Sequence, residues 1–382
     1  MKRSLQFLAF LSFALVAVNA FSQAVAYVYV ANNPKNSSTN QITAWAAGED
    51  GKLKPVSGSP FRDNVDAMAV DGGHLLAVDH SQRNIDTFVI ESDGALHYET
   101  SSNYGKYAPN DKCPVANQIF FDHTGATLYV QEFNADCSNT GVASFALNKA
   151  TGKLHYLGTD ITGVFPGVTN AALFTGNNKY AYSASNSGCM YYNIYGFKRG
   201  ANGMLTDAGS VANWPAPPPN FRRFIPLLAA ADPYNNLAVL MQPVNPPGCS
   251  SEPLQIATYT ANSSGVIKTR STYADMPSTL IATPYDMKMS PSGKLVAVAG
   301  QEGLQVFFFN EGVAAANYTG LLTKAPINQI FWDNSDHLYG ISQATNKLYV
   351  FTVTPTHISH APGSPHPVGD PQHLIVQPLI HR

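Results

Sequence analysis

Short apolar runs that alternate with polar residues recur along most of this chain, and they come in groups of four. The segment 64–101 contains one complete group, with turn residues between the runs. Alternation with a period of two predicts half-buried β-strands. The last two runs of a group flank a short loop with a late glycine, as in GEDGKL, ESDGAL, KATGKL, RGANGML and ANSSGVI. Because glycine supplies the positive φ that tight hairpins need, each group is predicted to be a four-stranded antiparallel sheet.

The first run of each group ends at an equivalent residue, and one version of this run occurs twice. The phrase NQIFFD at Asn117–Asp122 returns as NQIFWD at Asn328–Asp333. The seven equivalent end positions are Asp71, Asp122, Thr175, Asp232, Ser290, Asp333 and Gln377. They recur at intervals of roughly 40 to 60 residues, close to the length of a four-stranded β-propeller blade.

The two ends of the chain complete each other. The last apolar run, residues 372–380, is a first strand with no partners after it, whereas residues 26–33, 40–47 and 52–58 have the pattern of second, third and fourth strands that lack a first. Pairing 372–380 with 26–33 closes a ring that has no exposed sheet edge. We therefore predict an all-β, seven-bladed propeller whose C-terminal strand joins the N-terminal blade. A pair of β-sandwiches requires no repeat of this length, and the coils of a β-helix are much shorter.

The N-terminal residues have a different pattern. Lys2 and Arg3 precede an apolar run over residues 5–18, and small residues follow at Ala20 and Ala24. This order is typical of a secretory signal peptide, and the run is shorter than the roughly 20 apolar residues of a membrane anchor. We predict a signal peptide over residues 1–24 and a single propeller domain over residues 25–382. The mature protein is expected to be secreted or periplasmic, with no membrane association after cleavage.

The low charge of the chain narrows the classes of partner. Charged residues make up 13% of the sequence, against roughly 25% in an average protein, and the formal net charge is −2. Without a basic field the protein is not expected to bind nucleic acid. We expect a monomer with a small-molecule ligand.

The four cysteines are Cys113, Cys137, Cys189 and Cys249. In an oxidising compartment an even number of cysteines predicts disulfides, and the alternative of a zinc site lacks a C-x-x-C pair. Cys113 precedes the first strand of the third predicted blade, and the other three lie between second and third strands of the third, fourth and fifth blades. These loops share one face of a propeller. We predict the bridges Cys113–Cys137 and Cys189–Cys249, because this pairing needs contacts only within one blade or between adjacent blades.

A family resemblance rests on the first and last blades. YVYVANN is followed by ITAWAAGEDGKLKPVSGSPF, and GSPH at Gly363–His366 echoes GSPF at Gly58–Phe61. These segments resemble the repeats of lactonase-family seven-bladed propellers, which are similar to propeller-type 6-phosphogluconolactonase and to carboxy-muconate cyclising enzymes. The resemblance covers essentially the whole mature chain and implies a lactonase, a hydrolase of carboxylic esters. It also implies His and Arg where first strands begin. In this sequence His373 lies at one such start, and Arg222 and Arg223 lie just before another.

Polar residues gather where the first strands begin. The equivalent positions near the seven starts hold Asp66, Asn117, Asn170, Leu227, Tyr285, Asn328 and Gln372. The next positions add Gln118, Asp286, Gln329 and His373. Because buried polar groups need partners, this ring bonds within itself and fixes the blades, or holds calcium or magnesium through oxygen ligands, or binds the hydroxyl groups of a sugar or lactone. The candidate ligand-binding residues are Asn117, Gln118, Asn170, Tyr285, Asn328, Gln329 and Gln372.

Ester hydrolysis at this ring would need a base and a group that stabilises an oxyanion. The candidate bases are Asp66, Asp286 and Glu132, and the candidate electrostatic partners are Arg222, Arg223 and His373. The sequence has no G-x-S-x-G motif, so we expect direct attack by water. Two functions follow. One is an exported lactonase-like propeller that hydrolyses a sugar lactone or a related cyclic ester, and the alternative is a non-catalytic propeller that binds a carbohydrate or a protein.

Overall fold

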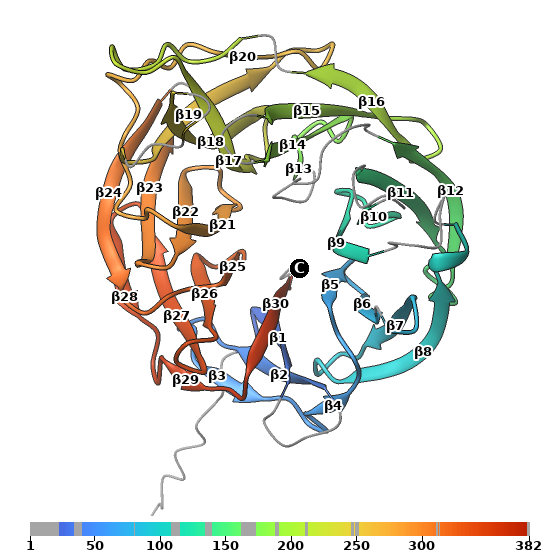
Figure 1. Ribbon diagram of the computed structural model, residues 1–382. Helices are drawn as coiled ribbons and strands as arrows, with labels where there is room; N and C mark the ends of the chain where they lie inside the picture. Colours follow the sequence, from blue (N-terminus) through green and yellow to red (C-terminus); the bar gives the residue numbers. More distant parts are fainter. Residues whose placement is uncertain are drawn as a thin grey trace, which may run out of the picture.

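Seven β-sheets stand around a central axis in the computed structural model of the chain, like the blades of a propeller (Figure 1). The structure describes residues 23–33, 40–79, 81–107, 115–133, 140–161, 173–187, 191–210, 213–245, 248, 252–310, 312 and 314–379. Within these residues the regular structure is β-strand, apart from one short 3₁₀ helix, η1 (Gly105–Tyr107). The prediction of an all-β, seven-bladed propeller is confirmed.

Each blade is an antiparallel sheet whose first strand lies nearest the axis. Blade one has β30 (Pro371–Pro378), β1 (Ala26–Asn32), β2 (Gln41–Ala47) and β3 (Leu53–Pro55), with β4 (Phe61–Arg62) also on β2. Blade two has β5 (Ala67–Val70), β6 (His74–Asp79), β7 (Asn84–Ile90) and β8 (Leu96–Asn103). Blade three has β9 (Val115–Phe121), β10 (Thr127–Phe133), β11 (Thr140–Leu147) and β12 (Leu154–Ile161). Blade four has β13 (Leu173–Phe174), β14 (Tyr180–Ser187), β15 (Tyr191–Arg199) and β16 (Leu205–Ser210).

The remaining three blades follow the same order. Blade five has β17 (Arg223–Ala231), β18 (Asn236–Val244), β19 (Gln255–Ala261) and β20 (Ile267–Thr269). Blade six has β21 (Pro284–Met289), β22 (Leu295–Gly300), β23 (Gly303–Asn310) and β24 (Ala314–Thr323). Blade seven has β25 (Gln329–Trp332), β26 (His337–Ser342), β27 (Lys347–Thr354) and β28 (His357–His360), with β29 (His366–Pro367) also on β27.

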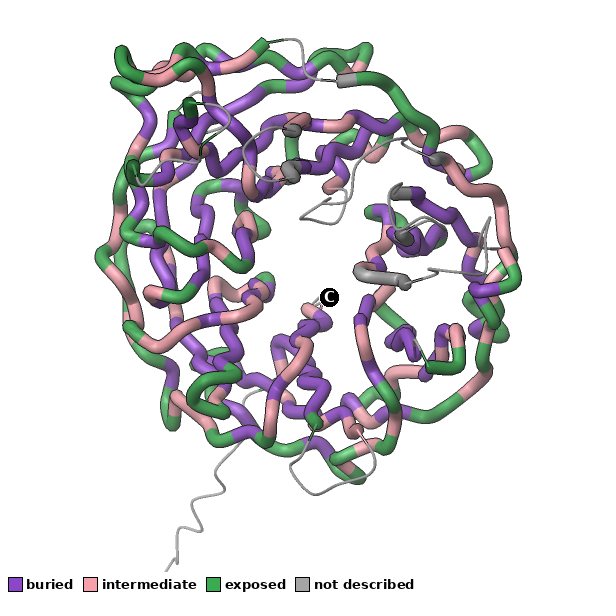
Figure 2. The backbone as a smooth tube through the Cα atoms, in the orientation of Figure 1, coloured by how far each residue is buried: buried purple, intermediate pink, exposed green. Residues whose placement is uncertain are grey.

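The two ends of the chain close the ring as predicted. β30 pairs antiparallel with β1, with Tyr27 opposite Gln377 and Val30 opposite Leu374. All seven residues of β1 are buried, because it lies between β30 and β2 within the blade and between neighbouring blades on its two faces. Apolar residues from adjacent sheets form the core clusters, and exposure rises toward the outermost strands (Figure 2).

The end of each inner strand is fixed by a turn that leads into the second strand. In four blades an Asp caps this turn: Asp71, Asp122, Asp232 and Asp333 each accept backbone N–H groups of the following residues through Oδ1. Asp333 Oδ2 also binds the His337 ring at 2.7 Å and the Tyr339 hydroxyl at 2.8 Å. The repeated Asp of the sequence therefore has the same structural role in each of these four blades, which is to satisfy the donors of the turn.

Buried tyrosines link some blades to the next through the glycine hairpins. The hydroxyl of Tyr29 in blade one donates to the Gly94 carbonyl of blade two, and that of Tyr182 in blade four donates to Gly265 of blade five. Gly94 and Gly265 have positive φ, as the loop pattern predicts. A Cβ at Gly94 would clash with the Tyr27 ring, so a side chain is excluded by contact as well as by backbone conformation.

The echoed GSP segments occupy equivalent places in blades one and seven. Both contain a cis peptide, at Ser59-Pro60 and Ser364-Pro365, and both lead into a short strand that pairs with the third strand of its blade. Ser59 Oγ accepts the Ala44 N–H, and Ser364 Oγ accepts the Val350 N–H, at 2.9 and 2.8 Å.

The predicted signal peptide and the predicted disulfides fall mostly on residues that the structure does not describe. Most of the signal peptide of residues 1–24 lies outside the described residues, and so do all four cysteines of the predicted bridges. In the part of the chain that is described, no helix is long and apolar enough to cross a membrane.

Candidate functional site

A cavity of about 1020 Å³ lies on the propeller axis, and the inner strands of all seven blades line it. Its wall has two ends that differ in chemistry. At the start face, where the inner strands begin, polar side chains point inward. At the turn face, where Asp71, Asp122, Asp232 and Asp333 cap the turns, the carboxylates are bonded to the backbone. The start face is therefore the candidate site.

The polar positions predicted near the strand starts are β-bulges in several blades. The strand register skips one residue in each of four inner strands, because the pairing passes from one of its neighbours to the other; these residues are Asn117, Leu227, Tyr285 and Gln372. A bulge re-aims the side chains beside it. Consecutive residues can then face the same side, and both Tyr285 and Asp286, and both Gln372 and His373, line the cavity.

Along the rim between blades seven and one, the amides bond to one another. Asn328 Oδ1 accepts the Gln343 N–H at 2.9 Å, and Gln343 Nε2 donates to Gln372 Oε1 at 3.3 Å. Gln372 Nε2 in turn donates to Asp370 Oδ1 at 3.0 Å. Tyr285 on blade six donates its hydroxyl to Gln301. At these rim positions the polar side chains bond to one another, which agrees with the hypothesis that the ring bonds within itself.

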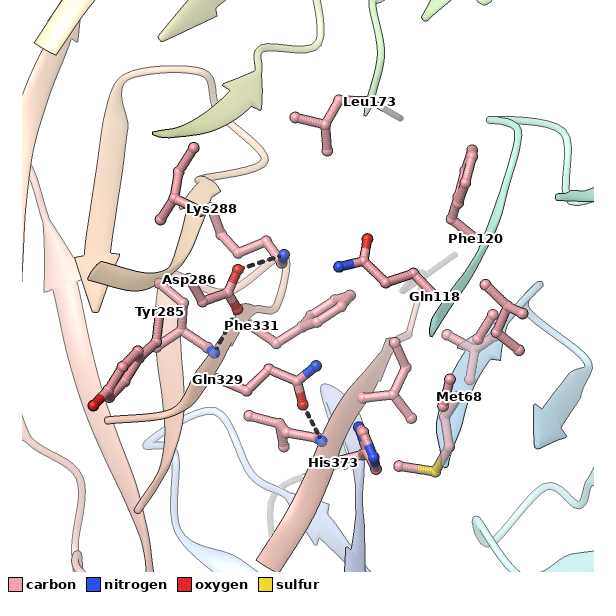
Figure 3. A pocket seen from close by; sticks show the side chains of 18 of the residues that line it. Met68, Gln118, Phe120, Leu173, Tyr285, Asp286, Lys288, Gln329, Phe331 and His373 are labelled. Atoms are coloured by element: carbon pink, nitrogen blue, oxygen red, sulfur yellow. Dashed lines mark hydrogen bonds and ion pairs between the residues drawn. The ribbon is translucent and has the colours of Figure 1, made fainter. Parts of the chain in front are cut away.

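Inside this rim, two side chains reach across from one blade to the next. Asp286 Oδ2 accepts the Ile330 N–H at 2.9 Å, which joins blade six to blade seven. Gln329 Oε1 accepts the Leu374 N–H at 2.6 Å, which joins blade seven to blade one. Both acceptors hold equivalent places on their strands, so they fix the inner strands relative to each other. The Gln329 amide nitrogen points toward the cavity (Figure 3).

Asp286 also holds a lysine that sequence reasoning missed. Lys288 Nζ lies 2.8 Å from Asp286 Oδ1, and the Lys288 side chain retains 33% of its exposure against 9% for Asp286. The two residues lie two apart on β21, so their side chains share the inward face. Gln118 extends into the same space from blade three (Figure 3). Gln118 Oε1 is buried and has no hydrogen-bond partner in the described structure.

The remaining predicted site residues are spread over other places. Asp66 bonds to Val78 through its backbone N–H and is not among the described residues that line the cavity. Arg222 is exposed. Arg223 lies over the Tyr192 ring, 4.5 Å from its centroid, and donates to the Tyr192 hydroxyl, so the stacking holds it away from the cavity lining.

Three candidates have no described side chain. The side chains of Asn117 and Glu132 are outside the described part of the structure, as is the whole of Asn170. For the predicted calcium or magnesium site, the described residues contain no group of three or more His, Cys, Asp or Glu side chains arranged to hold an ion.

A carboxyl group with an unusual environment lies on the start side but away from the cavity. Asp63 is in the connection between β4 and β5, and burial together with the nearby charge of Asp86 raises its pKa to about 7. Asp79, whose Oδ1 is bonded to Ser81 and Gln82, adds to the effect. Asp63 is therefore protonated over a range in which an ordinary Asp is ionised.

No family model and no curated protein sequence matches this chain. Solved structures do match it over nearly its whole length. A Bacteroides uniformis protein provisionally named 6-phosphogluconolactonase has a TM-score of 0.65 and 13% identity, covering 93% of this chain and 100% of its own. A Bacteroides fragilis protein with the same provisional name has a TM-score of 0.63 and 12% identity, over 92% and 97% of the two chains.

A protein with a different name matches equally well. A Sulfolobus tokodaii protein, provisionally named selenium-binding, has a TM-score of 0.64 and 7% identity, covering 92% of this chain and 93% of its own. At such identities the matches show the fold alone. The fold implied by the resemblance to lactonase-family propellers is thus confirmed, and the chemistry has to be argued from the cavity.

Proposed function

We propose that this protein is a lactonase-like propeller that hydrolyses an uncharged cyclic ester at the start face of the central cavity. The observation that carries the proposal is the Asp286–Lys288 pair, a fixed cation on the cavity wall among amide side chains. The provisional names of the two Bacteroides neighbours support a lactone as the substrate class.

The pair suits the charge that develops when an ester is attacked. As a water oxygen bonds to the acyl carbon, the carbonyl oxygen becomes an oxyanion, and a preorganised cation stabilises it. Lys288 Nζ would donate to this oxygen, because Asp286 already fixes its position and is itself held by the Met287 and Ile330 N–H groups. Gln118 and the Gln329 amide nitrogen would orient the hydroxyl groups or ring of the substrate.

His373 is the residue best suited to move the proton. It lines the cavity next to the Gln329–Leu374 hydrogen bond, and an imidazole is the side chain that most often transfers protons as a general acid or base. We assign it to accept a proton from the attacking water and to return that proton to the ring oxygen when the acyl–oxygen bond breaks. The product is the open hydroxy acid. Asp286 is less suited to act as the base, since both its oxygens accept hydrogen bonds.

One observation favours the alternative of a binding propeller without catalysis. The Asp286 and Gln329 oxygens accept backbone N–H groups of the next blade, so these polar side chains at the strand starts have a structural role. Such a protein would bind a sugar or lactone on the amides without turning it over. We further propose export, on the basis of the N-terminal sequence.

Hydrolysis of δ-gluconolactone, measured above its spontaneous rate, tests the proposal. The variant Lys288→Met lacks the cation that would stabilise the oxyanion, and its kcat is expected to fall on the order of a hundredfold. The matched control is Lys268→Met, an exposed lysine on the outermost strand of blade five, which should retain the parent rate. His373→Ala should lose activity while His357→Ala, exposed on β28, should not. Saturable binding of the lactone without turnover would overturn the hydrolase and support the binding propeller.

A further inference from the structure

In blades one, three and seven the cavity wall changes from polar to apolar one step along the inner strands, whereas blade six has Lys288 at the equivalent place. Two residues after Gln118, Gln329 and His373 stand Phe120, Phe331 and Ile375, whose side chains therefore point to the same side. Leu173 of blade four lies at the matching level. Phe120, Leu173 and Phe331 are only half-buried, although they lie deep in a ring of sheets, because they face the cavity (Figure 3).

These apolar side chains are held in place from behind. Phe120 stacks on Tyr129, with ring centroids 5.3 Å apart, and Phe331 packs against the core cluster between blades seven and one and against the cluster between blades one and two. A preformed apolar wall next to a few polar groups is the usual composition of a small-molecule site. The wall below the amides is thus suited to receive an apolar part of a ligand.

The charge of the lining does not suit a phosphate. Lys288 is the only lysine or arginine among the described residues that line the cavity. Its Nζ lies 2.8 Å from Asp286 Oδ1. Binding of a phosphate dianion typically uses several donors from Arg or Lys, often bidentate. Arg223, a predicted electrostatic partner, is stacked on Tyr192 and is not among the lining residues. An uncharged ligand matches the cavity better.

We infer that the preferred substrate is an uncharged lactone that carries an apolar substituent. The lactone carbonyl lies at Lys288 and the amides, and an alkyl chain extends from the ring onto Phe120, Leu173, Phe331 and Ile375. This inference rests on the proposed function for the chemical step, and it adds the substrate class. It sets this protein apart from an enzyme for phosphorylated sugar lactones.

A series of δ-lactones with increasing chain length tests the inference. Each buried methylene is expected to raise kcat/KM about fourfold, from δ-hexalactone through δ-octalactone to δ-decalactone, until the wall is covered. A phosphorylated sugar lactone should be hydrolysed no faster than δ-gluconolactone. A kcat/KM that is independent of chain length, or a tenfold preference for the phosphorylated substrate, would overturn the inference.

A variant and a non-reacting ligand complete the test. In Leu173→Asn, kcat/KM should depend less on chain length. The control is Leu280→Asn, at a 56% exposed leucine outside the cavity lining, which should keep the parent dependence. If no lactone is hydrolysed, the proposed function fails, and binding of piperidin-2-one and 6-pentylpiperidin-2-one measured by calorimetry still decides the inference. At least tenfold tighter binding of the pentyl compound supports the apolar wall as a ligand site, and equal binding contradicts it.

Discussion

The two ends of the inner strands carry polar residues for opposite reasons. At the turn face the Asp residues repeat from blade to blade, and Oδ1 of each accepts the N–H groups of its own turn. At the start face the polar residues vary more, since Lys288 and His373 each occur in one blade only, and Gln118 recurs as Gln329 in blade seven. The Asp that recurs in four blades serves a need that those blades share, whereas Lys288 and His373, which break the repeat, belong to something the whole ring forms once, which is the cavity.

The pKa values of two aspartates show the same contrast. At the turn face, burial alone would raise the pKa of Asp71, but the hydrogen bonds from the His74 ring and the Gly73 N–H outweigh burial and lower it. On the start side, burial and the Asp86 charge raise the pKa of Asp63 to about 7. The Asp71 carboxylate is thus stabilised by its turn, whereas the Asp63 carboxylate is disfavoured by its surroundings.

The largest expected effect comes from opening the ring. Deleting residues 371–382 removes β30, which buries Leu374, Ile375 and Val376, and leaves β1 with an unpaired edge. We expect loss of the cooperative thermal transition, measured by circular dichroism. The control is deletion of residues 380–382 alone. A truncated protein that melts at the parent temperature would refute closure by β30.

The next effect concerns a turn cap. Asp333→Ala removes a fully buried carboxylate that accepts bonds from the Ser335 and His337 N–H groups, the His337 ring and Tyr339. Leaving these donors without an acceptor should lower the free energy of unfolding by roughly 3–5 kcal/mol. Asp50 is exposed, and its Oδ1 accepts the Lys52 N–H in a hairpin, so Asp50→Ala should cost about 0.5 kcal/mol. Chemical denaturation measures both, and equal costs would contradict the structural role of the repeated Asp.

A pH effect should follow from Asp63. Its pKa is raised in the folded state, so between the ordinary value of 3.8 and about 7 the folded protein binds more protons than the unfolded chain. The free energy of unfolding therefore falls by roughly 1–3 kcal/mol as pH rises through this window. Asp63→Asn should remove that part of the slope in urea denaturation at pH 5 and pH 7.5, and Asp50→Asn should leave it intact. A parent protein that becomes more stable from pH 5 to 7.5, with the same slope in Asp63→Asn, would rule out this assignment.

The smallest stability effect is expected at the start face. Gln118→Leu keeps the size of a side chain whose Oε1 lacks a partner in the described structure, so unfolding should change by less than about 1 kcal/mol. Lactone turnover or binding should nevertheless fall about tenfold, because an orienting amide is lost. Unfolding and kinetics are measured on the same sample. A large stability loss with unchanged function would place Gln118 with the turn caps instead.

The fold could be predicted because each blade repeats its requirements in the sequence. The alternating strands, the glycine of each hairpin and the unmatched terminal strands were sufficient to predict the ring and its closure by residues 372–380. The structure places that closure strand at β30, Pro371–Pro378, and shows the predicted positive φ at Gly94 and Gly265.

The site was less predictable, for two physical reasons. Bulges at Tyr285 and Gln372 shift the inward face by one residue, and an alignment counted from strand ends does not reveal them. Lys288 stands where other blades have Phe331 or Ile375, and a charge at an apolar inward position was the signal that could have identified it. Arg223 was a reasonable candidate by position, but its stacking on Tyr192 depends on a contact between blades that no local pattern contains.

One measurement tests the central claim most directly, namely that the start face of the axial cavity is the site. A crystal structure of the protein with 6-pentylpiperidin-2-one, at a concentration that calorimetry shows to be saturating, locates the ligand. We predict the lactam carbonyl within hydrogen-bond distance of Lys288 Nζ and the pentyl chain against Phe331 and Phe120. A ligand bound outside the cavity, or bound inside it without contact to Lys288, would contradict the account.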